Sequence, residues 1–172
     1  MATCGQNFQK RSLTARPAVS VASALLSAVM FSTPAVAQTA KQFSIFENIT
    51  LSPDFTPDPT TVRGISGGAR PAAEIAGRAD TATGPCVGFV DDQPDHTMQL
   101  TQFFNYLSLQ VQSPEDTTLV IRGPGGSWCN DDYQSANPGI AGQWLSGTYQ
   151  IWIGSYERDR YMPYVIRITD QR

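Results

Sequence analysis

The segment Asn130-Asp131-Asp132 is the strongest candidate for chemistry in this sequence. Three side-chain oxygens in one loop suit a hard cation such as calcium, and Asp116, Asn137 and backbone carbonyls could complete about six to eight ligands. The spacing is not that of an EF-hand, because the D-x-[DN]-x-[DN]-G pattern and its final Glu are missing. The alternative is a turn built by local hydrogen bonds of Asn and Asp. We therefore expect either a calcium site or an acidic turn at 130–132.

Aromatic side chains form the second candidate site. Trp152 alternates with Ile151 and Ile153, so it belongs to the opposite face of its strand. If that face is exposed, Trp152 and Tyr156, with Trp128 nearby, form a contact surface on which a sugar ring could stack. If the sheet is covered on both sides, these aromatic residues are core residues. Both alternatives remain open from the sequence.

A catalytic site is not indicated by any motif in this chain. Gly64-Ile65-Ser66-Gly67-Gly68 matches G-x-S-x-G, but that motif needs a strand-turn-helix in a parallel sheet and a positioned histidine. The sequence shows no βαβ alternation, so we interpret the segment as a glycine-rich turn. His96 is the single histidine, and we interpret it as a surface or turn residue, since catalytic zinc requires three protein ligands. We expect no enzyme, with a small serine hydrolase as the least favoured alternative.

The first 37 residues read as a cleaved signal peptide. Three basic residues precede an apolar run at 17–31, and Ala35-Val36-Ala37 fits the small-x-small cleavage rule. Removal of this segment leaves nine Lys and Arg against 15 Asp and Glu. That acidic balance argues against nucleic acid or an anionic membrane as the partner. The sequence predicts a periplasmic or secreted protein that begins near Gln38 and does not remain in the membrane.

Cys86 and Cys129 are the two cysteines that follow the predicted signal peptide. Two cysteines in an exported protein usually pair. A metal or redox pair is disfavoured, because there is no C-x-x-C motif. We expect a Cys86–Cys129 disulfide.

Short apolar segments with period-two alternation dominate the rest of the chain. The clearest is 105–113, where Leu107, Leu109 and Val111 share one face. Further strands are expected at 117–122, 140–145 and 148–156, with a polar loop beginning at Trp128. Turn residues separate the segments about every ten residues, which is typical of a sandwich. We predict an all-β, single antiparallel β-sandwich (jelly-roll-like) of seven or eight strands at 63–172, preceded by an arm or linker at 38–62.

The run from Asp116 to Gly154 also carries a resemblance. The succession of an apolar strand, Gly123-Pro124-Gly125-Gly126, the acidic segment Trp128–Asp132 and a Gly147-Thr148-Tyr149 strand resembles small secreted cyanobacterial proteins of unassigned function. It is more loosely similar to the pre-peptidase C-terminal domains of secreted proteases. That resemblance implies a non-catalytic β-sandwich, in some members calcium-binding. It carries over no catalytic residue, and only Asn130, Asp131 and Asp132 map onto a site.

Taken together, these observations predict a non-enzymatic exported module with a binding or structural role, with calcium as the candidate cofactor. The alternative is a carbohydrate-binding module that uses Trp152, Tyr156 and Trp128. An extracellular protein or a polysaccharide is the expected kind of partner.

Overall fold

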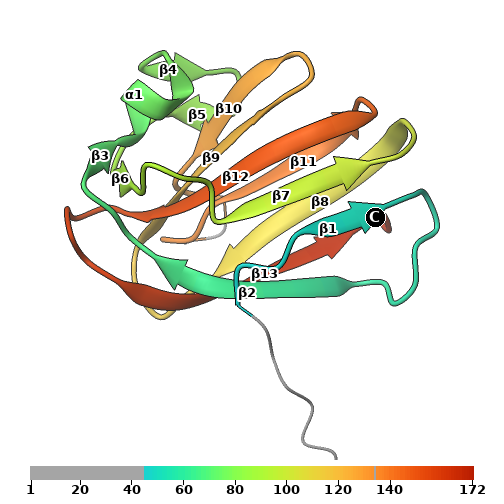
Figure 1. Cartoon of the computed structure of the whole chain (residues 1–172), viewed down its shortest axis with the longest axis horizontal. Helices are drawn as coiled ribbons and strands as arrows, with labels where there is room; N and C mark the ends of the chain where they lie inside the picture. Colours follow the sequence, from blue (N-terminus) through green and yellow to red (C-terminus); the bar gives the residue numbers. More distant parts are fainter. Residues whose placement is uncertain (1–44, 134) are drawn as a thin grey trace, which may run out of the picture. The chain divides into compact units, whose positions relative to one another are not determined.

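The structure, a computed structural model, describes residues 45–133 and 135–172. The predicted signal peptide lies outside the described residues. The described chain is almost entirely β (Figure 1), which confirms the all-β prediction. One larger sheet contains β1 (Ile49–Leu51), β3 (Arg70–Pro71), β6 (Phe89–Val90), β7 (His96–Leu100), β9 (Thr117–Gly123), β10 (Gly126–Asn130) and β12 (Gly147–Ser155).

A second sheet faces the first and completes the sandwich. Its order is β11 (Gly139–Trp144), β8 (Phe104–Gln112), β13 (Met162–Thr169) and β2 (Thr60–Ser66). The inner faces of both sheets supply one apolar core, because alternate residues of each strand point inward. Leu107 and Leu109 of β8 and Ile151 and Ile153 of β12 belong to this core, as the period-two alternation predicts.

A short excursion covers the outer face of the larger sheet. It contains α1 (Ala72–Ala76) and a small hairpin of β4 (Asp80–Thr81) and β5 (Gly84–Pro85). Below it lies a second apolar cluster that includes Ala72, Val120 and Trp152. The Cys86–Cys129 disulfide, predicted from the sequence, ties this excursion to β10, with a Cα–Cα distance of 5.1 Å.

The strand pairing differs from the predicted purely antiparallel sheet at one place. β1 pairs with β7 in parallel, with Ile49 opposite Met98. β2 begins at Thr60, so the predicted arm at 38–62 contributes β1 and the start of β2 to the sandwich. Trp128, Cys129 and Asn130, expected in a loop, form the second half of β10. β2 pairs with β13 as far as Ser66, which lies opposite Met162. The segment predicted to be a glycine-rich turn is therefore the end of a strand.

Both sheets end in an unpaired edge on the same side of the sandwich. Among the described strands, β10 pairs with β9 alone, and β11 pairs with β8 alone. No described helix is long and apolar enough to cross a membrane.

Candidate functional site: the slot between β10 and β11

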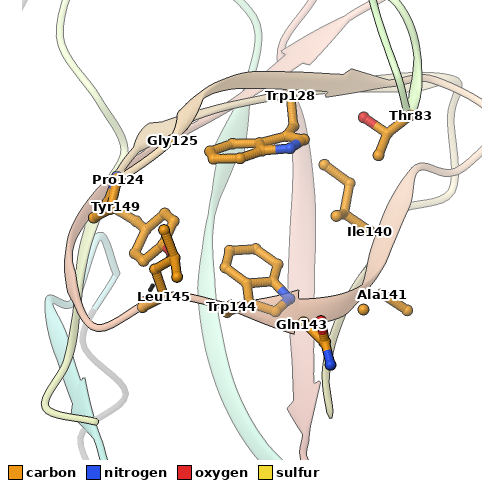
Figure 2. A pocket seen from close by; sticks show the side chains of 11 residues that line it. Thr83, Pro124, Gly125, Trp128, Ile140, Ala141, Gln143, Trp144, Leu145 and Tyr149 are labelled. Atoms are coloured by element: carbon orange, nitrogen blue, oxygen red, sulfur yellow. Dashed lines mark hydrogen bonds between the residues drawn. The ribbon is translucent and has the colours of Figure 1, made fainter. Parts of the chain in front are cut away.

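A slot of about 170 Å³ lies where the β10 and β11 edges approach each other. Figure 2 shows the indole rings of Trp128 and Trp144 on opposite sides of it, with Tyr149 at one end and Ile140 at the other. Pro124 and Leu145 complete the apolar lining, and Thr83 and Gln143 are its polar side chains. The described lining residues include no charged group, so the slot suits an uncharged, flat or apolar group.

The local sequence explains why aromatic rings line this edge. Trp128 lies opposite Ile121 on the inner face of its sheet, and it packs half-buried against the main core. Trp144 lies inward on β11 after a register shift between Gly142 and Trp144, which marks a bulge. Its indole N–H donates to the Leu107 carbonyl at 2.9 Å, which fixes the ring. The slot therefore has one rigid wall and one partly exposed wall.

Tyr149 forms the inner end of the slot because glycine stands opposite it. A Cβ at Gly123 would collide with the Tyr149 ring, so this position needs a residue without a side chain. The Tyr149 ring contacts Trp144 edge-on, with 5.1 Å between the ring centroids. Its hydroxyl donates to the Leu145 carbonyl at 2.9 Å, so the polar end of this ring is satisfied.

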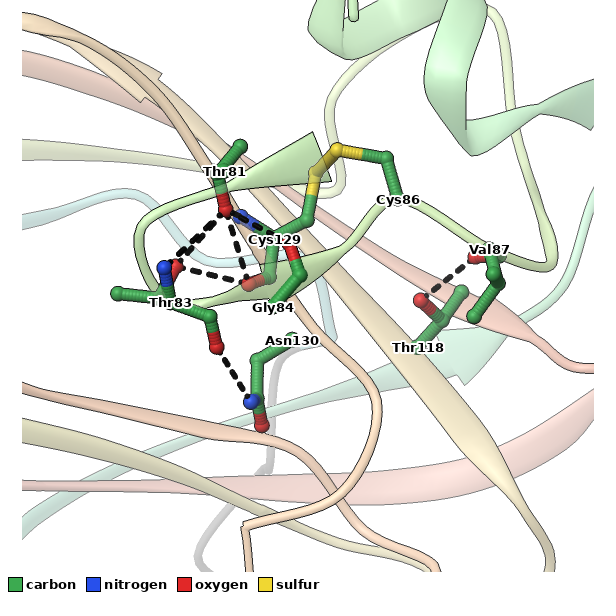
Figure 3. Close-up of a disulfide and its surroundings, with 8 residues drawn as sticks. All are labelled: Thr81, Thr83, Gly84, Cys86, Val87, Thr118, Cys129 and Asn130. Carbon is green, nitrogen blue, oxygen red and sulfur yellow. Dashed lines mark hydrogen bonds between the residues drawn. A yellow bond between two sulfur atoms is a disulfide. The ribbon is translucent and has the colours of Figure 1, made fainter. Parts of the chain in front are cut away.

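One end of the gap between the two edges is closed by polar side chains. Asn130 Nδ2 donates to the Thr83 carbonyl at 2.9 Å, while Asn130 Oδ1 accepts from the Gly139 N–H at 2.9 Å. Thr81 Oγ1 accepts from the Cys129 N–H at 2.9 Å, and Thr83 Oγ1 donates to the Cys129 carbonyl at 2.8 Å (Figure 3). These bonds satisfy the Cys129 N–H and carbonyl, which point away from the paired strand β9.

The acidic residues lie immediately beyond this closed end. The pKa of Asp131 is raised mainly by burial and then by the charge of Asp132. The pKa of Asp116 is also raised mainly by burial, and then by the charges of Asp132 and Asp131. The three carboxylates therefore lie close enough to repel one another. Among the described residues, none of the ion pairs involves these three acids.

The predicted calcium ligands are thus only partly brought together. The amide of Asn130 is already engaged with Thr83 and Gly139, so Asp131 and Asp132, with Asp116, are the available oxygens. Within the described ranges, no cluster of three His, Cys, Asp or Glu side chains has the arrangement to hold a metal ion. Calcium at 130–132 stays a prediction.

The predicted aromatic face is divided by the fold. Trp152 is 3 % exposed beneath the α1 excursion, so the exposed pair with Tyr156 does not form. The sequence placed Trp152 correctly on the outer face but could not show that residues 72–90 cover it. Tyr156 is 56 % exposed and stands outside the slot. Of the three predicted ligand residues, only Trp128 lines the slot.

The residues of the G-x-S-x-G motif do not form a hydrolase site. Ser66 is fully buried, and its hydroxyl lies 3.0 Å from the hydroxyl of Ser155. His96, expected at the surface, is 1 % exposed, with Nδ1 2.8 Å from the Glu47 carbonyl and Nε2 2.8 Å from the Tyr164 hydroxyl. The histidine therefore pairs with Tyr164 instead of Ser66.

A buried carboxyl neighbours this histidine. Asp95 Oδ2 accepts from the Ile153 N–H at 2.7 Å. Burial raises the pKa of Asp95 to about 7, although the bond from Ile153 acts in the opposite direction. Burial lowers the pKa of His96 and raises that of Tyr164. His96 has the same parity as Met98 and Leu100 on β7, so alternation placed it on the buried face, but its polar ring after an acidic turn was interpreted as a surface or turn residue.

Comparison with known proteins gives similarity without an assigned function. No family model matches the chain. An uncharacterized protein of Synechococcus elongatus is 23 % identical over 103 residues, which cover 58 % of this chain and 76 % of the relative.

Two solved structures show a limited structural likeness. The pre-peptidase C-terminal domain of a Bacillus anthracis collagenase gives a TM-score of 0.41 at 10 % identity, over 72 % of this chain and 95 % of that domain. A periplasmic inhibitor of g-type lysozyme from Aeromonas hydrophila gives 0.40 at 12 % identity, over 72 % of this chain and 96 % of that protein. The chain is thus similar in sequence to an uncharacterized cyanobacterial protein and, to a limited degree in structure, to a pre-peptidase C-terminal domain.

Proposed function

We propose that this protein is a non-enzymatic binding module whose binding site is the slot between β10 and β11. The observation that supports this most strongly is the half-buried ring of Trp128, which faces Trp144 across an open, uncharged space. Aromatic rings in a partly desolvated pocket provide much of the binding energy at protein contact sites. Ser66 and His96 are both buried. Ser66 is paired with Ser155 and His96 with Tyr164, which favours binding over catalysis.

An extracytoplasmic location accords with this proposal. The Cys86–Cys129 disulfide needs an oxidising compartment in most organisms, and the predicted signal peptide would deliver the chain there. In such a compartment, we expect the partner to be an extracellular protein or a polysaccharide.

A parallel screen tests the proposal. The purified, disulfide-bonded protein is applied to an array of neutral oligosaccharides and, separately, to a displayed library of random peptides. We expect ligands from one of these arms to bind the parent protein and Tyr156→Ala, but not Trp128→Ala. Tyr156 is the matched control, because it is an exposed aromatic residue outside the slot. Ligands that bind Trp128→Ala equally well would contradict the proposed site, and so would the absence of any binder.

A further inference from the structure

The free edge of β11 runs along the slot and carries hydrogen-bonding groups of its own. In an antiparallel pair, successive residues alternate between bonding to the partner strand and pointing away from it. The Val111 N–H donates to the Pro138 carbonyl at 2.9 Å, which fixes the phase of this alternation for the paired β11 and β8. The outward positions are therefore Gly139 and Ala141.

The two outward positions differ in their partners. The Gly139 N–H is satisfied by Asn130 Oδ1. Ala141 lines the slot, and the interactions of the described residues with other segments include none to its N–H or carbonyl. An unpaired edge of this kind is a template for another strand. At β10, Thr81 and Thr83 occupy the outward groups of Cys129, whereas the open position of β11, Ala141, lines the slot.

The chemistry around this edge defines what fits it. The slot is apolar and of a size for one large side chain, about 170 Å³. Only Thr83 and Gln143 present polar side chains to it, which is few for a hydroxyl-rich sugar ring. Beyond Asn130 lie three carboxylates that the described basic residues do not neutralise. A partner with a positive group next to an apolar one complements both features.

We propose that β11 binds an extended peptide segment of a partner protein as an added edge strand. The peptide pairs with Ala141, places one uncharged apolar side chain between Trp128 and Trp144, and places a lysine or arginine near Asp131 and Asp132. Main-chain pairing supplies affinity and the slot supplies specificity, which is the general mode of strand addition. This inference rests on the proposed function, because it names the ligand class of the same slot.

Three variants of the protein test the inference against peptides enriched from the random library. Ala141→Pro removes the outward N–H and leaves the bonds between β11 and β8 in place, since proline is tolerated where the N–H faces away from the sheet. We expect it to abolish peptide binding, while Tyr156→Ala, at an exposed residue outside the slot, binds as the parent does. The enriched peptides should share an apolar residue with a nearby lysine or arginine. Asp131→Asn combined with Asp132→Asn should weaken their binding by about fivefold or less, as for exposed charges.

A change in the peptide keeps the test decisive if Ala141→Pro misfolds. Methylation of alternate backbone nitrogens of an enriched peptide blocks strand pairing without altering the protein. Loss of binding on methylation of one alternating set of nitrogens, and not of the other, supports edge addition. If both methylated forms bind equally well, or equally poorly, strand addition at the β11 edge is overturned.

The glycan array separates this inference from the proposed function. Neutral oligosaccharides that bind in a Trp128-dependent manner, with no enriched peptides, would overturn the peptide inference and support the slot as a binding site. If neither oligosaccharides nor peptides bind, both proposals fall.

Discussion

Asn130 of β10 and Gly139 of β11 join the two sheets at the closed end of the slot, where the Gly139 N–H donates to Asn130 Oδ1 at 2.9 Å. The same amide reaches Thr83 of the disulfide-tethered excursion through Nδ2. One buried side chain thus holds together both edges that frame the slot and the segment that supplies its polar rim.

Replacement of Asn130 should therefore destabilise the protein more than its size suggests. Asn130→Ala leaves the Gly139 N–H without its partner in a buried setting, which costs about 1–3 kcal/mol. Chemical denaturation measures this cost. Asn105→Ala, at an exposed position of β8, is the matched control and should change the free energy of unfolding by less than about 0.5 kcal/mol. Equal effects of the two substitutions would contradict the bridging role.

Loss of the disulfide should lower the melting temperature by several degrees or more. The bridge closes a separation of 43 residues, which is worth about 4 kcal/mol in the chain-entropy model. Thermal unfolding of the Cys86→Ser, Cys129→Ser double variant measures this contribution. The double variant should also release the α1 excursion, which hydrogen exchange would detect at 72–90. Unchanged protection of these amides would show that apolar packing and the hydrogen bonds to β10 hold the excursion without the disulfide.

The buried carboxyl of Asp95 should give the protein a pH-dependent stability. Its pKa rises to about 7 in the folded protein from the ordinary value of 3.8, because burial disfavours the charged form. The folded state therefore binds more protons than the unfolded state between these values, and this contribution to stability falls as pH rises through that window. The lowered pKa of His96 acts in the opposite sense below its ordinary value of 6.5.

Asp95→Asn isolates the first of these two effects. The variant should gain stability relative to the parent as pH rises from 4 to 8, by at most about 4 kcal/mol. Denaturation series at several pH values measure the difference, with the exposed Asp80→Asn as the control. A difference between Asp95→Asn and the parent that is constant with pH would contradict the buried-acid assignment.

Calcium binding at the acidic segment is tested by melting the protein with calcium and with a chelator. Because the Asn130 amide is engaged with Thr83 and Gly139, a site there would rest on Asp131, Asp132 and Asp116. Calcium at about 100 times its dissociation constant would add about 2.7 kcal/mol, and Asp131→Ala or Asp132→Ala would remove the gain. An unchanged melting temperature would leave Asp131 and Asp132 as turn residues that follow β10.

Local alternation patterns predicted many of the strands and their buried faces. The remaining features depend on contacts between segments that are distant in the sequence. The alternation of Leu107, Leu109 and Val111 correctly predicted a sheet with one buried side, because that signal lies within one strand. Trp152 was assigned to the correct face, but its burial depends on α1, which is 76 residues or more away in sequence. Trp144 shares the inward face of β11 with Ile140, as alternation predicts, because the extra residue of the register shift lies on β8. Alternation does not show that the edges of the two sheets meet around this ring, so the sequence indicated the slot only through Trp128.

His96 illustrates the same limit for polar residues. A histidine after Asp91-Asp92-Gln93-Pro94-Asp95 looks like part of a turn, and nothing local indicates a tyrosine partner 68 positions later. Its parity with Met98 and Leu100 accounts for its burial, whereas its partner Tyr164 is revealed only by the facing strand β13.

The most direct test of the slot as a binding site follows the three tryptophan indole N–H resonances during titration with N-acetylphenylalanine amide, an uncharged peptide mimic with one aromatic side chain. The resonances are assigned from Trp→Phe variants. We expect saturable shifts at Trp128 and Trp144, with none at Trp152, which lies on the other face of its sheet beneath α1. No shift at Trp128, or an equal shift at all three residues, would contradict the slot as the place where this protein binds its partner.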